Sequence, residues 1–143
     1  MPRVQRTALL PFPAADVFAI VNDVSRYPEF LPWCSAATVI EESAEEVVAA
    51  LSLSASGITE TFTTRNRLTP CEKIDMELVS GPFRELTGGW TFVRLGDDEG
   101  CRVELDLSFQ FTGVKSLLGA VFNRAADKMV DAFCARATDV LSR

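Results

Sequence analysis

The side chains of this sequence that could carry acid–base chemistry are few, because its 143 residues include no histidine. Without histidine there is no Ser-His-Asp or Cys-His arrangement, no histidine-ligated metal and no imidazole base near neutral pH. A general base would have to be a carboxylate, a lysine or the single tyrosine, Tyr27. Glu60 is the best candidate, since an alternating strand places it on the same side as Ile58 and Phe62. The alternative is that Glu60 lies beyond the edge of the core and is paired with an arginine.

The four cysteines are poorly placed for a metal centre or a disulfide framework. Cys34, Cys71, Cys101 and Cys134 lie 30 to 37 residues apart, and the sequence has no Cys-x-x-Cys pair. Cys101 and Cys134 also fall on apolar faces of predicted elements, where a thiol is usually a small buried hydrophobic group. We therefore expect reduced, structural cysteines and no metal.

The charged residues give the chain an acidic balance, with 14 Lys and Arg against 20 Asp and Glu and a net charge of −6. A field of this sign repels phosphate backbones, which argues against general binding to DNA, RNA or anionic membranes. A local basic patch stays open, because Arg65, Arg67 and Arg84 lie away from the acidic run 41–46. The alternative for these arginines is a solvated outer face that counters neighbouring carboxylates.

Length and composition predict one folded domain over residues 1–143. Apolar residues make up 48% of the chain, including ten Phe and two Trp, which is typical of a packed core rather than disorder. No secretory leader pattern opens the chain, and no apolar run approaches about 20 residues. We therefore expect a cytoplasmic location.

The elements that must position any site follow from hydrophobic periodicity. The predicted strands are 3–10, 35–42, 45–56, 58–68, 73–79, 90–95 and 101–112, and the predicted helices are 14–24 and 115–142. Residues 101–112 alternate without error between apolar and polar side chains, which is typical of an antiparallel sheet with one solvated face. We expect one broken helical turn between Pro28 and Pro32, and an interruption over 80–89.

The order of these elements predicts an α+β fold, because the helices are segregated from a run of strands. A helix over 115–142 would span about 42 Å, and the strand over 101–112 would span about 41 Å. The last helix is therefore long enough to cross the whole apolar face of the sheet. It either simply closes the core or covers a cavity.

Four sequence words, in this order, resemble the START-like helix-grip superfamily of polyketide cyclase/dehydrase and lipid-transport proteins. They are "YPEFLPWC" (27–34), "TFTTRN" (61–66), "SGPFRELTGGW" (80–90) and "FNRAADKMVDAF" (122–133). Within the superfamily the chain is similar to the coenzyme Q-binding branch, which includes bacterial ribosome association toxins. The resemblance implies a curved antiparallel sheet of about seven strands wrapped around a long C-terminal helix, with two short helices after the first strand.

The resemblance also implies a function, which is non-enzymatic binding of a hydrophobic small molecule that supports respiration. A polyprenyl quinone such as ubiquinone is the expected ligand, with no covalent cofactor, in an apolar cavity between sheet and helix. The residues expected to line it are Tyr27, Phe30, Trp33, Leu51, Leu53, Phe62, Met76, Leu78, Phe83, Trp90, Phe92, Leu105, Leu107, Phe109, Leu118, Val121, Phe122, Ala125 and Met129.

Two other functions stay open. The toxin branch implies a regulator that binds the large (50S) ribosomal subunit and blocks subunit association, with Arg65, Arg67 and Arg84 as candidate contacts. Other branches imply a cyclase or dehydratase, for which a Glu, Asp or Lys in the cavity or Tyr27 would have to supply the base, with Glu60 as the best candidate. The quinone function would place the protein in the cytoplasm, peripheral to the inner membrane.

Two segments have a functional and a structural interpretation. The rings of Tyr27, Phe30 and Trp33 either form the mouth of the cavity or cap the end of the core without touching a ligand. The segment 80–90 is either a mobile loop that gates the cavity or an ordinary hairpin, with Gly88 and Gly89 allowing a bulge or a close backbone approach before Trp90.

Overall fold

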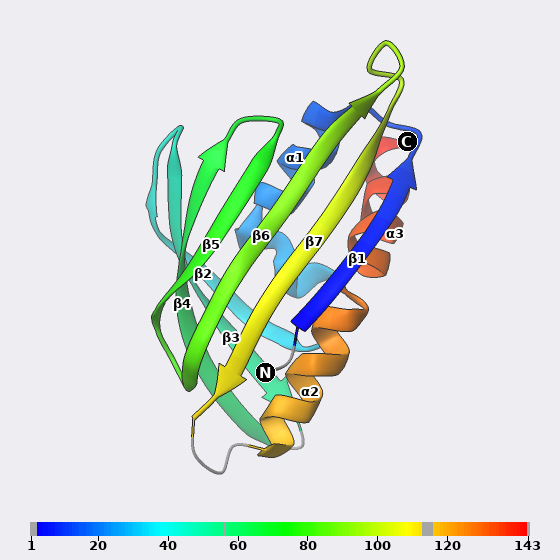
Figure 1. Ribbon diagram of the computed structural model, residues 1–143. Coiled ribbons are helices and arrows are strands. Elements are labelled where there is room, and N and C mark those ends of the chain that lie inside the picture. The colour runs from blue at the N-terminus through cyan, green and yellow to red at the C-terminus, as the bar shows by residue number, and fades with distance from the viewer. Residues whose placement is uncertain (1–2, 56, 113–115, 143) are drawn as a thin grey trace.

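The computed structural model describes residues 3–55, 57–112 and 116–142, and they form a curved antiparallel sheet around helices (Figure 1). The strands are β1 (Arg3–Leu10), β2 (Cys34–Glu42), β3 (Glu46–Ala55), β4 (Ile58–Thr69), β5 (Lys73–Ser80), β6 (Phe83–Leu95) and β7 (Gly100–Phe111). The helices are α1 (Ala14–Asn22), the 3-10 helix η1 (Val24–Glu29), α2 (Ser116–Asp127) and α3 (Met129–Leu141). The predicted α+β helix-grip architecture is confirmed.

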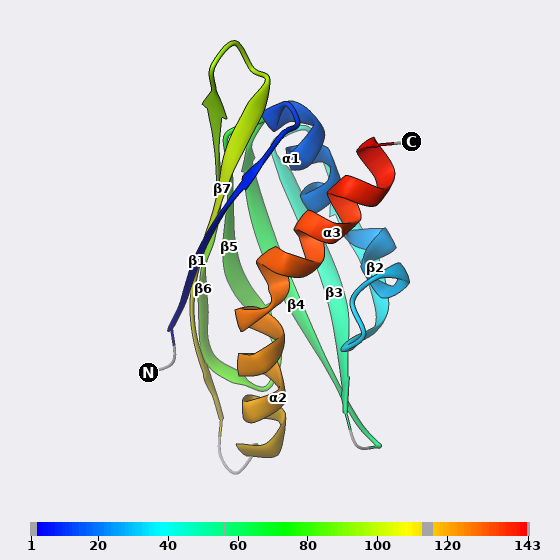
Figure 2. The ribbon, with the colours of Figure 1, turned by 90° about the vertical axis from the view of Figure 1, so that its right-hand side faces the viewer.

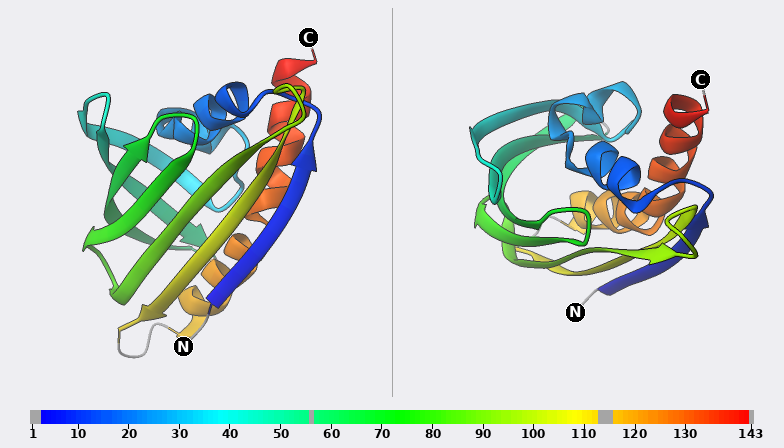
Figure 3. Two further views of the ribbon diagram at one scale, coloured as in Figure 1. Left: turned by 45° about the horizontal axis from the view of Figure 1, so that its top comes forward. Right: turned by 90° about the horizontal axis from the view of Figure 1, so that it is seen from above.

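The sheet is a meander that the first strand joins from the other end of the chain. Within the described residues its order is β1-β7-β6-β5-β4-β3-β2, so β2 to β7 pair in sequence and β1 pairs with β7. The two short helices α1 and η1 carry the chain from one sheet edge to the other (Figure 3). Helix α1 packs on part of the concave face, with Phe18 against Phe92 of β6, and α2 and α3 run along the rest of it (Figure 2).

The core lies between the concave face and the helices. On β7, Cys101, Val103, Leu105, Leu107 and Phe109 are each at most 2% exposed. This is the alternation expected for residues 101–112, and only its last apolar member, Phe111, is half-buried. Because every second residue of a strand faces the same side, one pattern fixes both the strand and the direction of its core face.

The C-terminal helix is broken, which corrects the prediction of one helix over 115–142. Lys128 separates α2 from α3 with φ −101° and ψ 2°, and its N–H is shared between the carbonyls of Arg124 and Ala125, 3.2 Å from each. The break turns α3 away from the line of α2, so that both helices follow the curved sheet (Figure 2). A period of 3.6 residues carries on across a one-residue break, so the sequence pattern does not reveal it.

The strand β6 is continuous from Phe83 to Leu95, which corrects the predicted interruption over 80–89 and the hypothesis of a mobile gating loop. Only Gly81 and Pro82 form the turn before it. A Cβ atom on Gly88 would lie 2.0 Å from the carbonyl oxygen of Asp106, and one on Gly89 would lie 2.1 Å from that of Ile74. The two glycines therefore allow close approach of neighbouring strands rather than ending a strand.

The proline-rich segment after α1 also differs from its prediction. The helical turn is the 3-10 helix Val24–Glu29, which contains Pro28, rather than a turn between Pro28 and Pro32. A short 3-10 helix tolerates Pro28 because the missing N–H removes only one of few hydrogen bonds. None of the helices in the described parts of the chain is long and apolar enough to span a bilayer.

Candidate functional site: an apolar cavity under the C-terminal helices

A small cavity of about 50 Å³ lies between the concave face of the sheet, η1 and the helix pair. Its walls come from segments that are far apart in the sequence but adjacent in the fold. The lining residues are Val24, Tyr27, Trp33, Leu51, Phe62, Thr64, Asn66, Met76, Leu86, Trp90, Leu107, Phe122 and Met129. We call it the inner cavity. A volume of this size admits a few water molecules at most, so a larger ligand requires side chains to move.

A second, larger space of about 260 Å³ lies on the outside of the same wall. We call it the outer groove, and it runs between the segment before β2 and the junction of α2 with α3. Its lining residues are Leu31, Pro32, Trp33, Val121, Arg124, Ala125, Lys128, Met129 and Ala132. Trp33 and Met129 line both spaces, so these two side chains form the partition between them.

Nine of the nineteen residues predicted to line a ligand cavity border the inner cavity, namely Tyr27, Trp33, Leu51, Phe62, Met76, Trp90, Leu107, Phe122 and Met129. Val121 and Ala125 line the outer groove instead. Leu53, Phe83, Phe92, Leu105 and Phe109 are buried in the core away from both spaces, and Phe30 and Leu78 are half-buried. Leu118 belongs to α2, but its side chain lies outside the described residues.

Four residues of the inner cavity were not predicted, namely Val24, Thr64, Asn66 and Leu86. Thr64 and Asn66 follow Phe62 at intervals of two on β4, so they share its inward face. This alternation was a usable signal. A polar pair is nevertheless unusual on a buried face.

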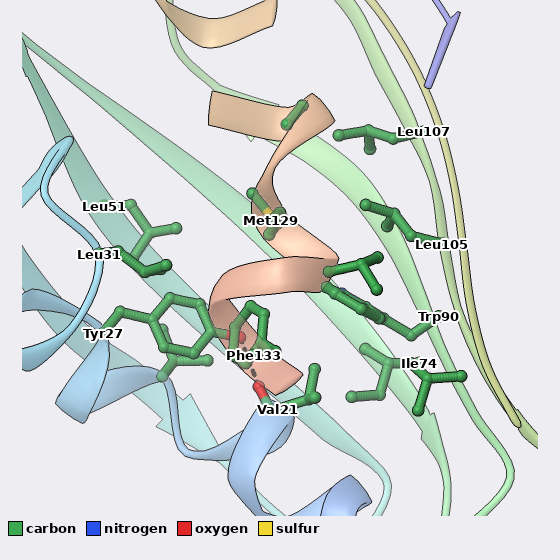
Figure 4. Close-up of a cluster of buried hydrophobic side chains, with 14 of the residues drawn as sticks. Val21, Tyr27, Leu31, Leu51, Ile74, Trp90, Leu105, Leu107, Met129 and Phe133 are labelled. Carbon is green, nitrogen blue, oxygen red and sulfur yellow. Dashed lines mark hydrogen bonds between the residues drawn. The ribbon is translucent and has the colours of Figure 1, made fainter. Parts of the chain in front are cut away.

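The aromatic rings of the proline-rich segment pack in two different ways. Tyr27 lies edge-on to Phe133 with ring centroids 5.2 Å apart, and its hydroxyl donates a hydrogen bond to the Val21 carbonyl (Figure 4). The ring centroids of Phe30 and Phe133 are 5.2 Å apart. The guanidinium carbon of Arg136 lies over the Phe30 ring, 5.0 Å from its centroid. Trp33 instead lies in the partition. Phe30 therefore packs at the end of the core, while Trp33 borders the inner cavity.

Helix α3 reaches across the core with Met129 and Phe133. Figure 4 shows these two side chains between Tyr27 and Leu31 on one side and Trp90 and Leu105 on the other. At the other end of the cavity, Phe122 of α2 forms edge-on contacts with Phe62 and Phe109. The ring centroids are 5.9 Å apart in the first pair and 4.8 Å apart in the second. Five of the thirteen lining residues therefore present rigid aromatic surface, whereas Met76 and Met129 have flexible side chains.

The ionisable groups near the cavity do not form an acid–base site. Burial raises the pKa of Tyr27, with smaller contributions from Cys34 and Asp23, so its hydroxyl stays neutral and acts as a donor to Val21. Glu60 stands opposite Leu53 on β3, is half-buried, and does not line the inner cavity. Burial also raises the pKa of Cys34, Cys101 and Cys134. All four cysteines are free, and the described residues hold no group of His, Cys, Asp and Glu suited to a metal.

The arginines proposed as ribosome contacts differ in their pairing. Arg65 forms ion pairs with Glu46 and Glu77, and Arg67 forms one of 3.1 Å with Glu77. These two therefore fit the description of outer-face arginines that counter carboxylates. Arg84 is exposed and has no ion pair with any described residue. The same holds for Arg124 and Lys128 at the outer groove.

Comparison with known proteins gives a consistent result. The model of the family described as polyketide cyclase / dehydrase and lipid transport matches residues 10–134. The ribosome association toxin RatA of Pseudomonas aeruginosa is 52% identical over 136 residues, which are 94% of each chain. The mitochondrial coenzyme Q-binding protein of Drosophila melanogaster is 25% identical over 130 residues, which are 87% of this chain and 54% of that one.

Two solved structures are similar over almost the whole chain. An 18 kDa protein from Caulobacter crescentus is 32% identical with a TM-score of 0.74, and all of both chains is covered. An aromatase/cyclase from a Streptomyces species has a TM-score of 0.81 at 22% identity, covering 95% of this chain and 93% of that one. The second likeness concerns the fold alone.

Proposed function

Because the chain belongs to the polyketide cyclase / dehydrase and lipid transport family, we propose that it is a non-enzymatic binding protein with two partners. The first is the large ribosomal subunit, whose association with the small subunit it would block. The second is a hydrophobic small molecule, with a polyprenyl quinone such as ubiquinone as the candidate. Both partners fit a place in the cytoplasm, with contact to the inner membrane when a quinone is exchanged.

The ribosomal function rests on one observation, the 52% identity over 94% of both chains to a protein named ribosome association toxin. The acidic net charge of −6 argues for a small basic contact rather than broad binding to RNA. Arg84, Arg124 and Lys128 are suited to such a contact, because no described carboxylate neutralises them.

A subunit-association experiment tests this function. Purified protein is added to separated large and small ribosomal subunits, magnesium is raised to promote association, and the particles are resolved on a sucrose gradient. We expect the peak of joined ribosomes to fall in proportion to added protein, which should sediment with the large subunit. An unchanged joined peak with no bound protein would exclude it.

The ligand function rests on the inner cavity and the adjoining outer groove. Their walls are almost entirely apolar, with a few polar groups, which is the composition of small-molecule sites. The coenzyme Q-binding relative supports a quinone as the ligand. A catalytic function gains no support here, because no carboxylate lines the cavity among the residues that the structure describes and Tyr27 holds its proton.

Extraction of the purified protein tests the ligand function. Protein from aerobically grown cells is extracted with organic solvent and the extract is analysed by mass spectrometry. We expect a near-stoichiometric hydrophobic molecule, which Trp33→Lys in the partition should abolish. Val79→Lys, at an exposed position on β5, is the matched control and should retain it. An empty extract together with no uptake of added quinone would exclude the function.

A further inference from the structure

The inner cavity contains a polar pair that the packing of the core does not require. Thr64 and Asn66 are 5% and 7% exposed, and they are the buried polar residues among those that the structure describes. The hydroxyl of Thr64 donates a hydrogen bond of 3.1 Å to the side-chain oxygen of Asn66. Burying an amide among apolar side chains is unfavourable unless its hydrogen-bonding groups find partners.

Asn66 has more hydrogen-bonding capacity than the structure uses. A side-chain amide offers two N–H donors and an oxygen with two acceptor positions. Among the described residues, Thr64 is its one side-chain partner, and that bond occupies the oxygen. The amide nitrogen of Asn66 therefore remains available to an acceptor placed in the cavity. The hydroxyl of Tyr27, another polar group of the wall, is already engaged with the Val21 carbonyl.

The wall also determines the charge of that acceptor. Among the described residues, no Asp, Glu, Lys or Arg lines the inner cavity, whereas Arg124 and Lys128 line the outer groove. An ionised carboxylate or phosphate in the inner cavity would lose its hydration without gaining a counter-charge. An uncharged oxygen, such as a carbonyl, meets the amide donor at much lower cost.

The position of Thr64 and Asn66 relative to the partition determines how a bound ligand would be oriented. The inner cavity borders the outer groove at Trp33 and Met129, and the groove beyond them is lined mainly by apolar side chains such as Leu31 and Val121. Met129 has an unbranched, flexible side chain that can move aside to enlarge the 50 Å³ of the inner cavity. A polar head that enters first would reach Asn66, and its apolar tail would then lie in the groove.

We infer that Asn66, held in place by Thr64, donates a hydrogen bond to an uncharged, carbonyl-bearing head group, and that the ligand's apolar tail leads out past Trp33 and Met129. This inference rests on the proposed ligand function and makes it more specific. It defines the ligand class as neutral amphiphiles with a carbonyl head, bound head-first. It excludes ligands that hold an anionic head in the inner cavity.

The test compares two probes that share a decyl tail on a six-membered carbon ring, of which only one has carbonyl groups on that ring. The probes are a decyl-substituted benzoquinone and decylbenzene, titrated calorimetrically into the wild-type protein, Asn66→Leu, Thr64→Val and the control Thr64→Ser. We expect the wild type to bind the quinone about tenfold more tightly than decylbenzene, the range of one buried hydrogen bond. Asn66→Leu should remove this preference while binding decylbenzene equally well or better. Thr64→Val should reduce the preference, and Thr64→Ser should retain it.

Each other outcome has a defined meaning. If the wild type binds both probes and Asn66→Leu leaves their ratio unchanged, the inference is wrong while the ligand function stands. If Asn66→Leu weakens both probes equally, Asn66 has only a structural role and the inference is again wrong. If the wild type binds neither probe, the ligand function fails as well. Should Asn66→Leu not fold, the Thr64→Val and Thr64→Ser pair decides, since loss of preference in the first alone supports the inference.

Discussion

Trp33 and Met129 come from distant parts of the chain, and their side chains together separate the inner cavity from the outer groove. Trp33 stands just before β2, and Met129 is the first residue of α3, directly after the break at Lys128. The helix break is therefore directly next to one of the two residues that form the partition. A shift of either side chain would join an enclosed space of about 50 Å³ to a groove of about 260 Å³.

Shortening Met129 should open the partition. We expect Met129→Ala to accelerate binding of a decyl-substituted benzoquinone severalfold and to lower the free energy of unfolding by about 2–5 kcal/mol, through lost burial and the new cavity. Stopped-flow quenching of tryptophan fluorescence measures the rate, and urea denaturation measures the stability. Met129→Leu conserves the volume and should cost less than about 1.5 kcal/mol. Equal binding rates in the two variants would contradict a gating role for this side chain.

The single tyrosine should report unfolding at alkaline pH. Burial raises the pKa of Tyr27 above its ordinary value of 10.0, so the unfolded chain releases this proton at lower pH than the folded one. The contribution to stability is therefore fully present below pH 10 and is lost as the pH rises above it. We expect tyrosinate absorbance to appear only together with loss of structure, followed by circular dichroism.

Tyr27→Phe is the control for this titration. The variant lacks the hydroxyl that donates to the Val21 carbonyl, so it should be less stable at neutral pH by about 1–3 kcal/mol. Its stability should then fall less steeply than that of the wild type above pH 10, because the variant lacks the buried phenol whose pKa folding raises. Tyrosinate absorbance that rises near pH 10 in a still-folded wild type would show that the hydroxyl is accessible.

Gly88 should tolerate no side chain, although it sits inside a strand. An added Cβ would lie 2.0 Å from the Asp106 carbonyl oxygen, and the φ of +141° is itself unfavourable for other residues. We expect Gly88→Ala to lower the free energy of unfolding by more than about 3 kcal/mol, combining backbone strain with overpacking. Gly96→Ala is the matched control, because Gly96 has φ +61° with open space around it. The control should cost about 1–2 kcal/mol in denaturant titrations, and equal losses would contradict the steric argument.

The arginines should contribute unequally to ribosome binding. Arg84 has no ion pair within the described residues, whereas the charge of Arg67 is already countered by Glu77 at 3.1 Å. We expect Arg84→Gln to weaken cosedimentation with the large ribosomal subunit and to reduce the salt dependence of binding by about one phosphate contact. Arg67→Gln should change both quantities less. A larger effect at Arg67 would move the contact to the outer face of β4.

Much of the fold was predictable from residues close together in the sequence. The alternation over 101–112 predicted β7 and its core face, and the order of periods predicted helices segregated from a run of strands. Sequence words alone also indicated the family to which the chain belongs. These features are local, because a strand or helix imposes its period on its own residues.

The tertiary structure decided features that depend on strand partners and on packing. The sequence predicted an interruption over 80–89, yet Gly88 and Gly89 lie in β6, where the carbonyls of Asp106 and Ile74 on the neighbouring strands leave no room for a Cβ atom. The helix break at Lys128 likewise follows the curvature of a sheet built from residues far away.

For the candidate site, too, some features were predictable from the sequence and others depend on tertiary packing. Composition excluded histidine chemistry, and periodicity predicted an apolar face between sheet and helix. Which side chains of that face border a cavity, and that Asn66 is among them, was decided only where β4, η1 and α3 meet. The reason is physical, since the period of a strand fixes the side to which a residue points, while an empty space depends on whether distant side chains fill it.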